Sequence, residues 1–121
     1  MKGANYRFIH WPMYQDAKKL LGLCHSIAKK LPSEYRFGLA NQIIRSSSSV
    51  ALNIAEGSGK QTDRDLNKYL NIARGSLFET IAALDILKEL GIAHHQEVEQ
   101  ALAVCMLVSH QISGFKKKLR T

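Results

Sequence analysis

Two short polar motifs hold the residue types best suited to chemistry: Asn53 with Glu56, and Ser76 with Glu79. Residues three apart lie about one turn apart on the same face of a helix. Carboxylates gathered in this way could bind a metal ion or act as general acid and base. A di-metal centre in a helical bundle uses Glu-x-x-His motifs, however, and neither glutamate has a histidine three residues later. The motifs therefore favour a structural polar network or a subunit contact, made by Arg45, Asn53, Glu56, Ser76 and Glu79, over a catalytic site.

Three other features that could carry chemistry are better explained by structure. The adjacent His94 and His95 would point about 100° apart on a helix, whereas zinc needs three or four converging ligands. Cys24 and Cys105 both fall on apolar stripes, where a free cysteine acts as a small buried side chain; a disulfide between them is geometrically conceivable. The Gly-Ser-Gly-Lys run that ends at Lys60 lacks the phosphate-loop pattern and a preceding strand. We therefore expect no catalytic residue, no metal site and no cofactor.

The basic residues are the remaining functional signal, because 17 Lys+Arg against 10 Asp+Glu give a net charge of +7. Such an excess favours an anionic partner. Exposed cations release counterions from phosphates and so bind nucleic acid in a salt-dependent way. The simpler alternative is a charged face that only keeps the protein in solution. The residues expected to contact nucleic acid are Lys60, Arg64, Lys68, Arg74, Lys116, Lys117, Lys118 and Arg120.

Hydrophobic periodicity predicts four helices that would position these residues, at about 13–31, 34–57, 63–90 and 95–118. Pro12 suits a first helical turn, Thr62 or Asp63 can cap the third helix, and Gly91 is placed to end it. The four serines at 46–49 remain in phase with the apolar residues on either side, which favours helix over a linker. Four amphipathic segments with short connections predict an all-α, antiparallel up-down-up-down four-helix bundle.

The length and composition are consistent with one domain over residues 1–121. No apolar run reaches the roughly 18 residues of a membrane span, and the first residues carry no apolar segment typical of a signal peptide. Two cysteines are too few for a disulfide framework. We therefore expect a cytoplasmic protein without a membrane partner.

Two longer stretches resemble one family, the small four-helix-bundle proteins encoded in intervening sequences of bacterial 23S ribosomal RNA genes. This family is related to the accessory variability determinant of diversity-generating retroelements. The resemblance covers roughly residues 8–115. The residues that carry it are Pro32-Ser33-Glu34, Gly38-Leu39, Gln42, Arg45, Ser49 and Asn53-Ile54-Ala55-Glu56-Gly57-Ser58-Gly59, followed by Leu70 and Ile72-Ala73-Arg74-Gly75-Ser76-Leu77-Phe78-Glu79.

The resemblance implies a ring-like homopentamer without enzymatic activity. For the retroelement branch it implies a basic accessory protein that binds RNA or DNA and a reverse transcriptase. Much of the rest of the family has no known function, so a protein-interaction scaffold is the alternative. The family often has a second arginine before the position of Arg45, where this chain has Ile44, and this weakens the case for nucleic-acid binding by the second helix itself.

Overall fold

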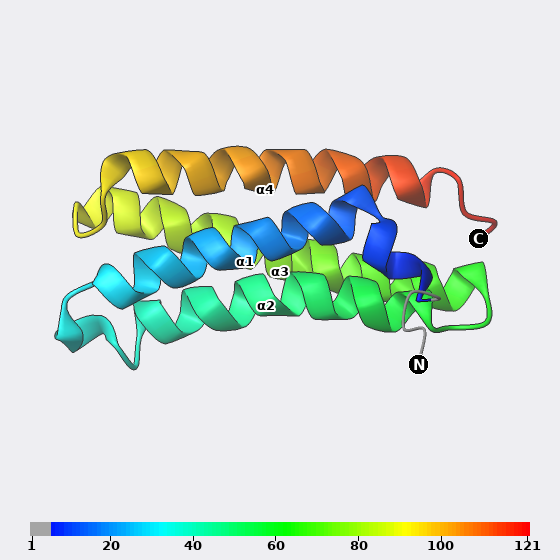
Figure 1. Ribbon diagram of the computed structural model, residues 1–121, viewed down its shortest axis with the longest axis horizontal. Coiled ribbons are helices and arrows are strands. Elements are labelled where there is room, and N and C mark those ends of the chain that lie inside the picture. Colours follow the sequence, from blue (N-terminus) through cyan, green and yellow to red (C-terminus); the bar gives the residue numbers. More distant parts are fainter. Residues whose placement is uncertain (1–5) are drawn as a thin grey trace.

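The computed structural model describes residues 6–121, and within them the chain forms four long α-helices joined by short connections (Figure 1). Each helix runs antiparallel to the previous one, and the fourth packs against both the third and the first. The predicted all-α, up-down-up-down four-helix bundle is therefore confirmed. The elements are the 3-10 helices η2 (Arg7–His10) and η3 (Ser33–Tyr35) and the α-helices α1 (Pro12–Lys30), α2 (Leu39–Ser58), α3 (Asp63–Leu90) and α4 (His95–Lys116).

The ends of α1 and α3 follow from local chemistry. Pro12 occupies the first turn of α1, where its missing N–H costs no hydrogen bond. The Thr62 hydroxyl accepts a hydrogen bond from the Asp65 backbone N–H at 3.1 Å and caps α3. Gly91 ends α3 with a φ of 65°, a left-handed conformation that favours glycine.

Two predicted boundaries were wrong. The second helix begins at Leu39 instead of residue 34, because the Pro32 carbonyl accepts a hydrogen bond from the Tyr35 N–H and closes a tighter 3-10 turn. A separate turn then precedes α2, in which Gly38 is not helical. The fourth helix ends at Lys116 instead of residue 118, since the N–H of Leu119 bonds to the Lys116 carbonyl, three residues earlier, and closes a tighter turn.

The core lies along the bundle axis and draws apolar side chains from all four helices. Leu20, Ile43, Leu77 and Val108, one from each α-helix, are completely buried. The serine run is helical, as predicted, and the Ser47 hydroxyl donates to the Ile43 carbonyl at 2.6 Å, which satisfies its polar group inside the core. Burial of these stripes is the main force that holds the helices together.

The α2–α3 pair is especially close near the connection between the two helices. A methyl group added at Gly57 would lie 2.8 Å from Tyr69 Cβ and 2.9 Å from Leu66 Cδ1. Only a residue without a side chain fits between these helices at that point. The glycine therefore permits the close approach of α2 and α3.

The α2–α3 connection, η2 and the end of α4 lie at one end of the bundle (Figure 1, right). The Arg7 side chain donates to the Ser58 carbonyl at 3.1 Å, and the Arg120 N–H donates to Asp63 Oδ2 at 3.0 Å. At the opposite end, Lys30 pairs with Glu97 at 2.8 Å. Among the described residues, no helix is long and apolar enough to cross a membrane.

Both cysteines lie buried in the core as free thiols. Burial raises the pKa of Cys24 to about 11, although a hydrogen bond with Ser47 partly opposes the shift. Burial, together with the neighbouring Cys24, raises the pKa of Cys105 to about 12. Each thiol is therefore held in its protonated, unreactive form, as expected for a structural side chain.

Replacing Gly57 by alanine should destabilise the fold by about 1–3 kcal/mol, because the new methyl group overpacks the α2–α3 contact. The matched control is Gly22→Ala in α1, where an added Cβ meets nothing within 4 Å. The free energy of unfolding of that control should rise by about 0.5–1 kcal/mol from helix propensity alone. Urea unfolding measures both changes, and equal stability of the two variants would contradict the close approach.

The buried thiols should make stability fall with rising alkaline pH. Between the ordinary thiol pKa of 9.0 and the folded values of about 11 and 12, the folded state keeps protons that the unfolded state releases. The free energy of unfolding should therefore fall as pH rises above 9.0, and stay free of this effect below it. Urea unfolding midpoints of the wild type and of Cys24→Ala, compared across this range, isolate the thiol contribution; identical pH slopes would refute it.

Candidate nucleic-acid interface

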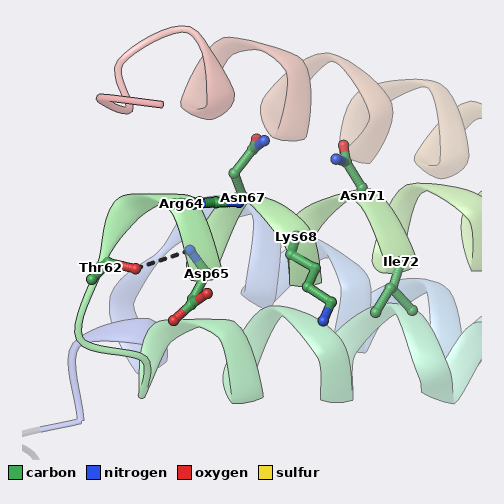
Figure 2. A pocket seen from close by; sticks show the side chains of 7 residues that line it. All are labelled: Thr62, Arg64, Asp65, Asn67, Lys68, Asn71 and Ile72. Atoms are coloured by element: carbon green, nitrogen blue, oxygen red, sulfur yellow. Dashed lines mark hydrogen bonds between the residues drawn. The ribbon is translucent and has the colours of Figure 1, made fainter.

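Lys116, in the last turn of α4, is held by two amides of α3. Its ammonium group donates to Asn67 Oδ1 at 2.8 Å and also to Asn71 Oδ1. Figure 2 shows both asparagine side chains pointing from α3 toward α4. Partial burial lowers the pKa of Lys116, and the positive charge of Arg74 lowers it further. Within the described residues no carboxylate pairs with this lysine, so its charge is not neutralised.

Two other predicted cations lie over aromatic rings of α3. The Arg74 guanidinium lies 5.2 Å from the ring centroid of the exposed Phe78, and the Lys60 ammonium lies 4.9 Å from that of Tyr69. Such contacts fix a long side chain without removing its charge. Arg74 therefore stays available to an anion close to Lys116.

A hollow of about 820 Å³ lies on the outer face of α3, over its first turns (Figure 2). Arg64 and Lys68 stand one turn apart along it, and both are exposed. Asp65 is its only acidic lining residue, and its position in the first turn suits the positive end of the helix dipole. The hollow is lined by Thr62, Arg64, Asp65, Asn67, Lys68, Asn71 and Ile72.

The structure brings the two predicted groups of basic residues into the same half of the bundle. Lys60 precedes α3, and Arg64, Lys68 and Arg74 belong to its first half. The other four residues lie at the end of α4 and just beyond it, where Arg120 is tied to Asp63 through its backbone. We call this surface the basic end, formed by Lys60, Arg64, Lys68, Arg74, Lys116, Lys117, Lys118 and Arg120.

Sequence reasoning missed Asn67 and Asn71, the two amides that hold Lys116. Their spacing of four residues places them on one face of α3, next to the apolar stripe. This spacing was a usable signal, but nothing in the sequence identifies the lysine opposite them.

The predicted polar network exists in part, as a seam between α2 and α3. Asn53 Nδ2 donates to Ser49 Oγ at 2.9 Å, and the hydroxyls of Ser49 and Ser76 lie 2.8 Å apart. Further along, the Thr80 hydroxyl lies 2.8 Å from that of Ser46. These bonds satisfy hydroxyl and amide groups that the close packing of α2 and α3 removes from water.

The charged members of the predicted network lie at the rim of this seam or outside it. Arg45 and Glu79 line a hollow of about 230 Å³ beside the seam, and Gln42 donates to Glu79. Glu56 is exposed and makes no side-chain hydrogen bond or ion pair with the described residues. The structure therefore supports a network role for Asn53 and Ser76, places Arg45 and Glu79 at its rim, and does not support one for Glu56.

The adjacent histidines are surface residues of the bundle. His94 and His95 are exposed at the start of α4. Over residues 6–121, no group of three or more His, Cys, Asp or Glu side chains is arranged to hold a metal ion.

Comparison with known proteins places the chain in a family. It matches the model of the 23S rRNA-intervening sequence proteins over residues 10–114. It is also similar to a protein of unknown function from the S23 ribosomal protein family of Bacteroides thetaiotaomicron VPI-5482, with 22% identity and a TM-score of 0.80. That alignment covers 88% of this chain and 99% of the other, and at this identity it shows the fold alone. No curated protein matches significantly. Because the family model spans most of its length, the chain belongs to the 23S rRNA-intervening sequence protein family.

Proposed function

We propose that this protein is a non-enzymatic accessory protein that binds the phosphate backbone of nucleic acid through its basic end. The observation that carries the proposal is the setting of Lys116. Its ammonium group is held in place by amide oxygens and has the charge of Arg74 nearby. An amide fixes a cation without neutralising it, so the site keeps its attraction for an anion.

The two ion pairs among residues 6–121 lie away from the basic end. Lys30 pairs with Glu97 at 2.8 Å and Lys88 with Glu99 at 3.0 Å, both at the end of the bundle opposite the basic end. These lysines lower the pKa of their glutamates, as expected for neutralised surface pairs. Both ion pairs of the described residues thus lie at one end, and neither involves a cation of the basic end. This asymmetry favours a binding role over a charge that serves only solubility.

Of the acidic residues near the basic end, Asp63 and Asp65 have structural explanations, whereas Glu56 is exposed and has none. Asp65 lies in the first turn of α3, and Asp63 accepts the Arg120 N–H. Carboxylates in the first turn stabilise the positive end of the helix dipole. They are therefore compatible with an anion-binding surface further along α3, around Arg74 and Lys116.

The family description gives the first ligand to test. Its proteins are named for intervening sequences of 23S rRNA. A structured RNA of that kind offers closely spaced phosphates, and binding through backbone contacts should be largely independent of sequence.

Replacing Lys116 by glutamine should weaken RNA binding about fivefold to tenfold near 0.1 M salt, because one phosphate contact is lost. The slope of log affinity against log salt should become shallower by about 1. The control is Lys29→Gln, an exposed lysine at the other end of the bundle, which removes the same charge. Fluorescence anisotropy over a salt series measures both. Equal losses of RNA affinity in the two variants would mean that only net charge matters, which would contradict the proposal.

We also propose that copies of this chain associate through the outer face of α4. Between Gln100 and Phe115 this helix has no Asp, Glu, Lys or Arg, and Met106 is 64% and Leu107 45% exposed. A helix that is apolar on both faces is normally covered on both. Five copies in a ring need a second, different contact face, because odd-numbered rings close only by head-to-tail contacts. The exposed Leu52 of α2 is a candidate for it.

The change Met106→Glu should break this association, because it buries an unpaired charge in the contact. Asn41→Glu, an exposed position on α2, adds the same charge elsewhere. Light scattering should show the mass of an oligomer for the wild type and for Asn41→Glu, and a smaller mass for Met106→Glu. A monomeric wild type, or an intact Met106→Glu oligomer, would remove α4 as the contact.

A protein-interaction scaffold is the second candidate function, and the same uncharged face of α4 favours it. The two candidates differ at the basic end, since a scaffold would bind RNA weakly and without saturation. No feature of the described residues favours a reverse transcriptase over other protein partners.

A further inference from the structure

A third hollow, of about 390 Å³, lies between the start of α1 and the last turns of α4. Its size falls within the range of about 300–1,000 Å³ that is typical of small-molecule sites. Trp11, Pro12 and Phe115 provide apolar walls, and the ring centroids of Trp11 and Phe115 are 4.6 Å apart. Gly114 leaves the space open, since a Cβ there would meet nothing within 4 Å.

Gln111, which lines this hollow, has a polar atom that lacks a partner. Gln111 Nε2 donates to Asp16 Oδ2 at 2.8 Å, and this bond fixes the orientation of the amide. Gln111 Oε1 is then a buried acceptor, and within residues 6–121 it is the only buried side-chain nitrogen or oxygen without a hydrogen-bond partner. Buried polar groups in folded proteins are nearly always hydrogen bonded, so this atom suits a ligand that carries an N–H donor.

Two cations lie close to the hollow. Lys118 lines it, and the Arg7 guanidinium lies 5.2 Å from the ring centroid of Trp11. The hollow also adjoins the basic end, because Phe115 and Lys116 are consecutive residues of α4. A ligand suited to this hollow therefore has a flat apolar group that carries an N–H donor. It also has a negative charge that stays outside the hollow.

We infer that this hollow binds an unpaired nucleobase of a bound nucleic acid. The base packs against the rings of Trp11 and Phe115, one of its N–H groups donates to Gln111 Oε1, and its phosphate lies near Lys118. Every base has a π-face and an N–H donor on an amino group or ring nitrogen, so the site accepts several bases. The inference rests on the proposed function for the route of the strand, because the neighbouring phosphates would lie on the basic end.

Trp11 provides a direct readout, because it is the only tryptophan of the chain. Titration with adenosine monophosphate should change its fluorescence, whereas ribose 5-phosphate, which lacks a base, should leave it unchanged. A single-stranded RNA should bind at least tenfold more tightly than an abasic ribose-phosphate oligomer of the same length. Equal effects of the ligands with and without a base would overturn the inference.

A variant that fills the hollow tests its location. Gly114→Leu places a side chain into the open space and should abolish the Trp11 response to adenosine monophosphate. Gly22→Leu in α1 is the matched control, since its added Cβ also meets nothing within 4 Å, and it should respond like the wild type. An unchanged response in Gly114→Leu would place the base elsewhere and overturn the inference.

Different results would refute the proposed backbone binding and the nucleobase site. An abasic oligomer that binds with strong salt dependence, without any base effect on Trp11, would support the proposed function and overturn the nucleobase site. A Trp11 response to adenosine monophosphate, without salt-dependent binding of the abasic oligomer, would support the nucleobase site and overturn backbone binding.

Discussion

The close contact of α2 with α3 is the constraint on which the rest of the arrangement depends. Gly57 permits it at the connection, and the hydroxyls of Ser49 and Ser76 meet across it at 2.8 Å. Small residues let the helices approach, and their hydroxyls then need partners, which only one register supplies. That register fixes the position of α3 along the bundle axis. It therefore decides which residues of α3, Asn67 and Asn71 among them, stand beside the end of α4.

Much of the fold could be predicted from local signals, because each signal acts within a few residues. Thr62 and Gly91 define α3 to the residue, since a side-chain cap and a left-handed glycine are local features. The start of α2 was missed because apolar spacing cannot distinguish a 3-10 turn over Ser33–Tyr35 from the first turn of an α-helix. Boundaries of this kind depend on whether an N–H bonds to the carbonyl three residues earlier, as in a 3-10 turn, or four residues earlier, as in an α-helix.

The candidate site was less predictable, because its contacts join residues far apart in the chain. Spacing identified Glu56 and Asn53 as neighbours on one face, but only the packed bundle shows that Asn53 faces Ser49 and that Glu56 faces solvent. In the same way, composition identified Lys116 as one of many cations. Its distinctive property is the pair of amides that hold it without neutralising it, and these come from another helix.

The proposed association and the proposed nucleic-acid binding would reinforce each other on this geometry. All cations of the basic end lie in one half of the bundle, whereas Met106 and Leu107 lie nearer the middle of α4. Cyclic symmetry would therefore repeat the basic end around a ring without covering it. A modest number of phosphate contacts in each copy would then act together, because once one copy has bound, the others meet the same strand at a high effective concentration. Loss of the ring would weaken binding even though no cation had been removed, so the measured salt dependence has meaning only at a known oligomeric state.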